Sequence, residues 1–358
     1  MINKDKLLEI AALFAIEGEI SEVKALGEGF INDTFVVRTQ GTAPDYILQR
    51  KNHIVFPDVP AMMENIRAVT EHIKSKVEDP MRETLTVVPA KDGKLYAEVD
   101  GNFWAVCRFI ENTASYDRAD TPELAYQGGV GIGRFQSLLA DFEKPLHETI
   151  KGFHNIRHRF EQWDATIAAN PAGRVAELSE EIGWIESRRE EMLAFWSLVE
   201  QGVIPTHVTH NDTKISNILF DAPTGKVLCA IDLDTVMSST SLNDFGDAIR
   251  SYTNTGAEDD PNLENVSMSL EMFRAYAEGY LSEQRTLCPA ELQWLAFSAR
   301  YITYEQVLRF LMDYIDGDKY YKIAYADHNL VRTRAQYKLL QSMEAQYDQM
   351  CEIVRSLA

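Results

Sequence analysis

The first third of the chain shows short apolar runs divided by turn residues. Residues 3–16 carry apolar side chains at helical spacing, which predicts an amphipathic helix at the start. The segments that follow are rich in β-branched and aromatic residues, a composition typical of antiparallel strands. The expected strands are Val23–Leu26, Thr34–Val37, Tyr46–Gln49, Thr84–Val88 and Phe103–Ile110. One further helix, expected over Ala61–Lys74, follows the third strand.

After about residue 115 the apolar spacing becomes that of helices. The expected helices are Leu124–Leu139, Ser179–Gln201, Leu270–Leu281, Pro289–Tyr314 and His328–Leu357. A strand-rich island, Ile204–Asp234, interrupts them. The pattern predicts an α+β fold with a small antiparallel-sheet lobe, residues 1–112, and a larger, mainly helical lobe, residues 113–358.

Charge narrows the range of partners. The chain contains 35 basic and 55 acidic residues, which gives a formal net charge of −20 at pH 7. A strongly negative surface repels nucleic acid, and no apolar run approaches the roughly 18 residues that span a membrane. We therefore expect a small-molecule substrate and no nucleic-acid or membrane partner. We also expect a monomer or weak homodimer, although neither the charge nor the hydropathy determines the oligomeric state.

The cysteines favour a reducing compartment. Cys107, Cys229, Cys288 and Cys351 are far apart in sequence, so their spacing matches neither a metal knuckle nor a redox pair. The first residues also lack the uninterrupted apolar core of a signal peptide. We expect a cytoplasmic protein.

The most informative motif is a polar loop followed by two apolar strands. The loop reads His210-Asn-Asp-Thr-Lys-Ile-Ser-Asn217, and the second strand ends in Ile-Asp232. Phosphoryl transfer requires an oriented hydroxyl, bound metal and charge compensation rather than covalent help from the protein. Asp212 is suited to orient the hydroxyl, whereas Asn217 and Asp232 offer the oxygen ligands that Mg²⁺ prefers. The spacing matches the catalytic loop of kinases.

Two other side chains of this loop are given supporting roles. Lys214 lies two residues after Asp212 and is expected to offset charge on the transferred group. His210 is expected to pack beneath the loop and support it. Any one of these polar residues also suits an ordinary turn between strands. Their combined order favours the catalytic interpretation.

This segment resembles the aminoglycoside phosphotransferase/choline kinase family, whose motif has the same His, Asp and Asn spacing followed by Ile-Asp. The resemblance extends from about residue 8 to residue 345 and is greatest to members that phosphorylate N-acetylhexosamines. It is carried by the runs Ile47–Arg50, Arg108–Glu111, His210–Lys214, Ile231–Thr235, Asp244–Asp247, Arg309–Leu311 and His328–Arg332. It implies a two-lobed, protein-kinase-like fold that uses ATP and Mg²⁺. The implied reaction phosphorylates the anomeric C1 hydroxyl of N-acetylglucosamine or N-acetylgalactosamine.

Two glycines stand between the first two expected strands. Gly27 and Gly29 would let backbone N–H groups approach phosphates without a Cβ in the way. An ordinary hairpin turn explains the pair equally well. The resemblance adds a second role for this turn, with Phe30 or Asn32 facing the sugar.

The third expected strand departs from protein kinases, which place a phosphate-binding lysine there. In the register that the pattern favours, Gln49 occupies that position, and a slip of one residue would put Arg50 there on the opposite face. Glutamine can hydrogen-bond a phosphate but carries no charge. Glu64 is available on the following helix as a carboxylate partner, although a solvated surface position suits it too. The missing lysine keeps open a nucleotide-binding pseudokinase.

The segment that joins the expected lobes contains Arg108, Phe109 and Ile110. In a kinase-like fold the backbone groups of this segment pair with the adenine edge, so its side chains are loosely constrained. We expect these three residues to bind the nucleotide.

The sugar is expected to contact the end of a long helix. Arg309 and Tyr320 offer a donor fork and a ring, which suit a neutral sugar. The alternative is a salt bridge of Arg309 with Glu305 or Asp313.

An Asp-Phe-Gly sequence that begins at Asp244 superficially resembles the metal-binding motif of protein kinases. Asp232 already ends the strand after the catalytic loop, so we expect Asp244 to cap a helix or brace that loop through backbone N–H groups. The leading hypothesis is a sugar 1-kinase. The alternatives are a kinase for choline, homoserine or an aminoglycoside, and a pseudokinase that only binds nucleotide.

Overall fold

The computed structural model describes residues 3–26 and 31–358, and the chain folds as two compact units. Unit 1 contains Met1–Ala114, Asp141–Lys151 and Leu219–Met237. Unit 2 contains Ser115–Ala140, Gly152–Ile218 and Ser238–Ala358. The first division lies two residues beyond the end of the predicted first lobe, and two later segments return to unit 1.

Unit 1 is built on an antiparallel sheet with the strand order β1-β2-β3-β6-β4, and β5 also pairs with β6. The strands are β1 (Ile20–Ala25), β2 (Asp33–Thr39), β3 (Tyr46–Lys51), β4 (Val87–Val88), β5 (Ala97–Val99) and β6 (Asn102–Arg108). The five predicted strands are confirmed, and β5 is an additional short one. In register, Gln49 of β3 pairs with Thr34 of β2 and with Ala105 of β6.

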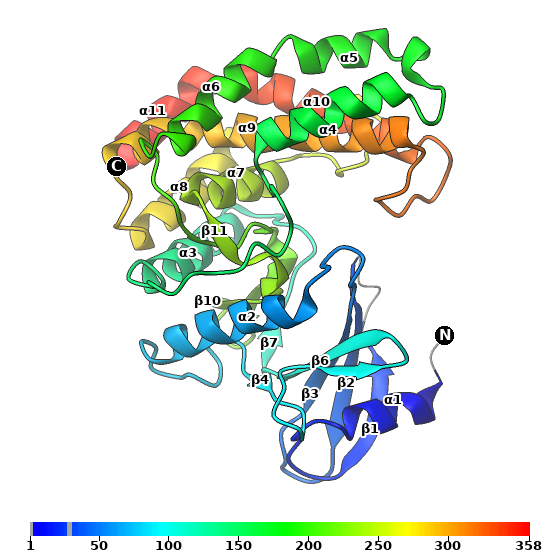
Figure 1. The fold of residues 1–358 in the computed structure, drawn as a ribbon. Coiled ribbons are helices and arrows are strands. Elements are labelled where there is room, and N and C mark those ends of the chain that lie inside the picture. Colours follow the sequence, from blue (N-terminus) through cyan, green and yellow to red (C-terminus); the bar gives the residue numbers. More distant parts are fainter. Residues whose placement is uncertain (1–2, 27–30) are drawn as a thin grey trace. The chain divides into compact units, whose positions relative to one another are not determined.

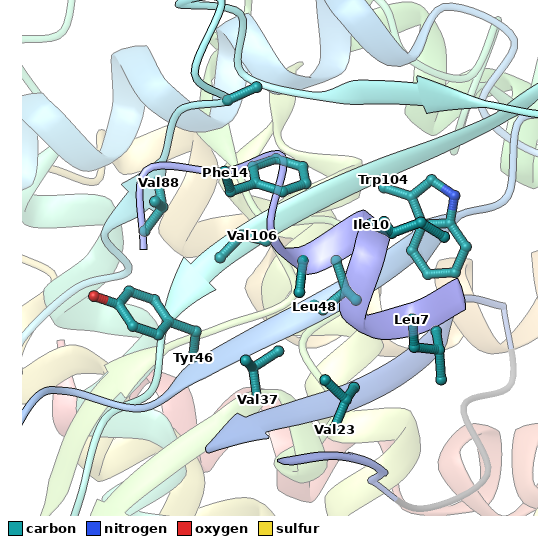
Figure 2. Packing of buried hydrophobic residues seen from close by; sticks show 12 residues of the cluster. Leu7, Ile10, Phe14, Val23, Val37, Tyr46, Leu48, Val88, Trp104 and Val106 are labelled. Carbon is teal, nitrogen blue, oxygen red and sulfur yellow. The ribbon is translucent and has the colours of Figure 1, made fainter. Parts of the chain in front are cut away.

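One face of this sheet is covered by helix α1 (Lys4–Ala11). Figure 2 shows Leu7 and Ile10 of the helix above Val37, Leu48 and other apolar side chains of the strands, and these residues share one buried cluster. Because successive strand residues point to opposite faces, the burial of Leu48 here sends its neighbours on β3 to the other face. That other face carries Gln49 and Lys51.

The remainder of unit 1 consists of helix α2 and short strands. These elements are α2 (Val59–Lys74), β7 (Thr113–Ala114), β9 (Ile218–Asp221) and β10 (Val227–Ala230). Asn65 is a buried polar residue on the apolar face of α2, and its Nδ2 donates to the carbonyl oxygens of His147 and Val236. This amide therefore ties the helix to the segment that follows Asp234.

Unit 2 is predominantly helical. Its helices are α3 (Pro122–Leu138), α4 (Ile156–Ala169), α5 (Ser179–Glu186), α6 (Arg189–Glu200), α7 (Ser241–Tyr252), α8 (Leu270–Glu283), α9 (Pro289–Asp316), α10 (His328–Ala345) and α11 (Tyr347–Leu357). The strands β8 (His207–Thr209) and β11 (Met237–Ser239) are short. Helix α9 packs against α4, α7, α10 and α11, and Figure 1 shows α4, α9 and α10 side by side.

The sequence did not predict α4 or α7. Helix α7 buries Asn243, Asp244 and Asp247 together with its apolar side chains, so its polar residues conceal which face is internal.

The α+β class is confirmed by the sheet of unit 1 and the helices of unit 2. Within residues 3–26 and 31–358, no helix has both the length and the apolar content to cross a membrane.

Candidate active site

The polar loop between β8 and β9 brings together the side chains that the sequence singled out in unit 2. Asp212 Oδ2 accepts a hydrogen bond from Asn217 Nδ2 at 2.9 Å and lies 3.0 Å from Lys214 Nζ. Asn217 Nδ2 also donates to the backbone oxygen of Asp212 at 2.8 Å. The Asp212 side chain is 26% exposed, so one edge of the carboxylate remains open to an incoming molecule.

The surroundings of Asp212 favour its ionised form. Burial raises the pKa of this carboxyl. The charge of Lys214 and the hydrogen bonds from Lys214 and Asn217 lower the pKa by a larger amount, so the net pKa lies below the usual value. A carboxylate that stays ionised at neutral pH can accept a hydrogen bond from a substrate hydroxyl. Lys214 thus faces Asp212, and its predicted contact with a phosphoryl group stays a prediction.

Helix α7 braces the backbone of this loop. Asp244, which is fully buried, accepts from the N–H groups of His210 at 3.0 Å and Asn211 at 2.7 Å. Asp247 accepts from the N–H of Thr213 at 2.8 Å. The predicted bracing by Asp244 is confirmed, whereas the predicted helix cap is wrong because the side chain of Thr240 caps α7. Burial raises the pKa of Asp244 above its usual value.

His210 supports the loop from beneath, as the sequence predicts. Its side chain is fully buried, and its Nδ1 accepts the backbone N–H of Asp212 at 3.2 Å. The ring packs edge-on against Phe135 of α3, with 5.7 Å between ring centroids. His210 is therefore a structural acceptor for the peptide that carries Asp212.

The oxygen donors predicted for Mg²⁺ have suitable chemistry. Both hydrogen bonds of the Asn217 side chain use Nδ2, and within the described residues Oδ1 has no hydrogen-bond donor. Asp232 follows β10 in a left-handed turn with φ 57°, a conformation that aspartate tolerates better than most residues. An amide oxygen and a carboxylate fit a hard cation such as Mg²⁺.

The expectation that β3 lacks a lysine is wrong. The strand extends two residues beyond Gln49 and ends in Lys51, whose side chain is 4% exposed. Lys51 Nζ donates to Asp234 Oδ1 at 2.7 Å and to Gln49 Oε1 at 2.7 Å. Gln49 lies on the predicted face of the strand, and the error was to take it as the lysine position and to stop the strand there. Since side chains alternate, residues 49 and 51 share a face.

Asp234 and Asn32 complete the surroundings of Lys51. Asn32 Nδ2 donates to Asp234 Oδ2 at 2.7 Å, and Asn32 Oδ1 accepts from the N–H of Asn52 at 3.0 Å. Burial lowers the pKa of Lys51, but the charges of Asp234 and Asp232 outweigh it, so the net pKa is raised and the ammonium stays charged. The lysine partner is therefore Asp234, and not Glu64, whose exposed carboxylate faces His147.

The remaining nucleotide and sugar predictions for unit 1 have different outcomes. Gly27, Gly29 and Phe30 lie outside the described residues. Asn32 uses both ends of its amide within the protein, and its contact with a sugar stays a prediction. Gln49 accepts from Lys51 and donates to Thr34, and its contact with a phosphate also stays a prediction.

The predicted adenine segment follows β6. The N–H of Arg108 donates to Thr86 at 2.9 Å and that of Phe109 donates to Asp45 at 2.9 Å. In the part of the chain that the structure describes, the N–H of Ile110 has no acceptor. Of the three residues, Ile110 therefore retains the backbone donor that an adenine edge would need.

Arg309 lies among aromatic rings rather than in a salt bridge. Its guanidinium carbon lies 5.4 Å from the ring centroid of Phe153, 5.8 Å from that of Tyr320 and 5.6 Å from that of Tyr321. No carboxylate of residues 3–26 or 31–358 pairs with it, so the alternative salt bridge is wrong. The guanidinium donates to the side chain of Gln306 at 3.3 Å.

The loop after α9 is fixed by one carboxylate. Asp313 accepts from the backbone N–H groups of Lys319, Tyr320 and Tyr321 at 2.8–3.0 Å. This arrangement holds Tyr320, which is 52% exposed, and Tyr321 beside Arg309. Sequence reasoning missed Tyr321 and Phe153, because loop conformation alone decides which rings meet the guanidinium.

A sequence model described as the phosphotransferase enzyme family (APH) matches residues 22–287. This range covers more than half of the chain and includes the polar loop, Lys51, Asp232 and α7. The match ends before α9, so Arg309 and the loop after it lie beyond the matched part.

Solved structures share the fold at low sequence identity. A microcompartment-associated aminopropanol kinase is 17% identical, with a TM-score of 0.65, and the match covers 97% of this chain and 98% of that one. A spectinomycin phosphotransferase in complex with ADP and spectinomycin is 13% identical (TM-score 0.57; 99% and 98% covered). An ethanolamine kinase of Plasmodium vivax is 12% identical (TM-score 0.57; 88% and 81% covered). These matches confirm the predicted kinase-like fold.

Proposed function

The chain belongs to the phosphotransferase enzyme family, and on this premise we propose that it is an N-acetylhexosamine 1-kinase. The reaction transfers the γ-phosphate of ATP to the anomeric C1 hydroxyl of N-acetylglucosamine or N-acetylgalactosamine, giving the sugar 1-phosphate and ADP. The observation that carries the phosphotransferase chemistry is the ionised, partly exposed carboxylate of Asp212, held by Lys214 and Asn217.

Asp212 has the properties of a residue that orients the attacking hydroxyl. Its carboxylate accepts the hydroxyl hydrogen bond, which directs an oxygen lone pair at the γ-phosphorus. As the new O–P bond forms, the bond to the β-phosphate oxygen breaks, ADP leaves, and the hydroxyl proton passes to Asp212. The bracing of residues 210, 211 and 213 by α7 keeps this carboxylate in place without reorganisation.

The nucleotide is proposed to be ATP with Mg²⁺. The ADP bound to the spectinomycin phosphotransferase supports an adenine nucleotide. Asn217 Oδ1 and the Asp232 carboxylate would hold Mg²⁺, which supplies charge neutralisation on the phosphate oxygens. Lys51 adds a positive charge to the unit that carries Asp232, and Ile110 offers a backbone donor for adenine. The charged Lys51 weakens the argument for a pseudokinase.

The surroundings of Arg309 favour a neutral sugar over an amine. The half-buried Arg309 guanidinium forms no salt bridge within the described residues, and although Glu305 offsets part of its charge, it disfavours a cationic substrate such as choline or an amino alcohol. The same group donates well to the hydroxyls and the acetamido carbonyl of an N-acetylhexosamine. Rings at 5.4–5.8 Å offer flat apolar surface for the carbon face of the sugar.

The test is ADP release from Mg·ATP with a panel of acceptors. The panel contains N-acetylglucosamine, N-acetylgalactosamine, glucose, galactose, choline, ethanolamine, aminopropanol and homoserine. We expect release with an N-acetylhexosamine and a product whose phosphorus resonance couples to H1. Release with amines alone would replace the substrate and leave the chemistry in place. Nucleotide binding without turnover across the panel would favour the pseudokinase.

Arg309→Leu is expected to raise the KM for the sugar about 10- to 100-fold, the usual cost of a lost hydrogen bond to a charged group. The KM for ATP should stay within twofold, because Arg309 belongs to the proposed sugar site alone. Arg309→Lys retains the charge but not the fork, so it should give an intermediate value. Arg285→Leu removes an exposed arginine of unit 2 and serves as the control. A sugar KM that is unchanged in Arg309→Leu contradicts the assignment.

A further inference from the structure

A buried histidine outside the predicted site contacts the catalytic loop. His154 stands just before α4 with φ 57°, and its side chain is 4% exposed. Its Nδ1 lies 2.6 Å from Glu305 Oε2 on α9. Its Nε2 lies 3.1 Å from the backbone oxygen of Asn211, the residue before Asp212. The sequence offered no pattern that links residue 154 to residue 211.

Both partners of the imidazole are acceptors. The backbone oxygen of Asn211 cannot donate, and Glu305 also accepts from Arg159 Nε at 3.1 Å, as an ionised carboxylate does. A neutral imidazole has one N–H donor, so it can satisfy one of these contacts only. With Glu305 ionised, as its hydrogen bond from the Arg159 guanidinium favours, the two contacts together require an imidazolium that donates from both ring nitrogens.

The charged groups around His154 agree with this state. The charges of Glu305 on α9 and Asp247 on α7 act on His154, and those of Arg159 on α4 and Arg309 on α9 act on Glu305. Burial lowers the pKa of His154, but the carboxylates of Glu305 and Asp247 raise it more, and the net pKa lies above the usual value. The same imidazolium, with Arg159 and Arg309, holds the pKa of Glu305 well below its usual range despite burial.

The hydrogen bond from His154 helps to fix the peptide group between Asn211 and Asp212, whose C=O and N–H are both bound. The C=O of Asn211 accepts from His154, whereas the N–H of the same peptide, on Asp212, donates to His210 Nδ1 at 3.2 Å. A rotation of this peptide would therefore break two buried hydrogen bonds. Glu305, which holds His154, lies one helical turn before Arg309 on the same face of α9.

We propose that His154 is a positioning residue which, donating to both Glu305 and the Asn211 carbonyl, fixes Asp212 and links it to the helix that carries Arg309. This inference rests on the proposed function, because it assigns Asp212 a role in phosphoryl transfer.

The kinetic test compares His154→Gln with the wild-type enzyme. Glutamine can donate to one of the two acceptors, so Asp212 loses part of its alignment, and we expect kcat to fall about 10- to 100-fold. The KM for ATP should change less than twofold. The control His147→Gln removes an exposed histidine that also faces a carboxylate, Glu64, and should leave kcat unchanged. An unchanged kcat in folded His154→Gln overturns the proposal.

The pH profile separates positioning from a merely structural role. A histidine with a raised pKa is charged below that pKa, so the wild-type kcat should fall only as pH rises through it. Glu305→Gln removes the charge that raises the pKa, so this alkaline limb should move to lower pH. If the limb is identical in the wild type, Glu305→Gln and His154→Gln, His154 does not act on Asp212. Glu305→Gln also serves if His154→Gln does not fold.

A spectroscopic measurement tests the protonation state of His154 without any phosphoryl-acceptor substrate. In protein labelled with ¹⁵N-histidine, His154 should show two protonated ring nitrogens at pH 7.5, a resonance that is lost in His154→Gln. A singly protonated ring would overturn the inference even if the kinase reaction is found. A doubly protonated ring without turnover on any acceptor would instead count against the proposed function.

Discussion

Asp212→Asn is expected to lower kcat about 10³-fold, the usual contribution of a positioned proton acceptor. Asparagine keeps the size of the side chain and one acceptor oxygen for Asn217 Nδ2, but its amide cannot take the hydroxyl proton. Lys214 also loses the carboxylate it faces. Steady-state ADP release with the best acceptor of the panel measures the effect.

The fold of this variant should be retained, which distinguishes lost chemistry from unfolding. Lys214, the cation that Asp212 faces, is 34% exposed, so the loss of the carboxylate charge leaves no fully buried cation behind. Asp164→Asn is a matched control, since Asp164 is also a carboxylate paired with a cation, Arg189, on unit 2. Turnover near the wild-type rate in Asp212→Asn would exclude Asp212 from the reaction.

Lys51→Met is expected to lower kcat/KM for ATP about 10²-fold, as is typical when one preorganised charge beside phosphates is removed. It should also destabilise the protein by about 3 kcal/mol, because Asp234 is left as a buried carboxylate without its cation. Urea denaturation followed by tryptophan fluorescence measures the second effect. Lys94→Met, which removes an exposed lysine of unit 1, is the control.

A double variant separates the two consequences. Lys51→Met with Asp234→Leu removes both charges of the pair, so much of the lost stability should return. Activity should not return, because the positive charge is still missing. Recovery of both stability and activity would show that Lys51 serves the fold alone and takes no part in the reaction.

Local patterns were sufficient for most of the fold and pointed to a phosphotransferase. Short runs rich in β-branched and aromatic residues predicted the strands around Gln49. Helical spacing predicted α9, because burial against one face imposes that period on the sequence. The spacing of Asp212, Asn217 and Asp232 indicated phosphoryl transfer because short segments hold them. Helix α7 was not predicted, because Asp244 and Asp247 point inward to backbone N–H groups and interrupt the apolar pattern of the buried face.

Contacts between segments that are far apart in the chain could not be predicted from the sequence. Lys51 meets Asp234 across more than 180 residues, and His154 meets Glu305 across about 150. A buried charged side chain needs an oppositely charged or hydrogen-bonding partner. The amino-acid sequence does not identify this partner, because only packing determines which polar groups are excluded from water together. The sequence alone determined the class of fold and indicated candidate residues for phosphoryl transfer. The tertiary structure decided which charges support them, since desolvation and hydrogen bonding are properties of the folded chain.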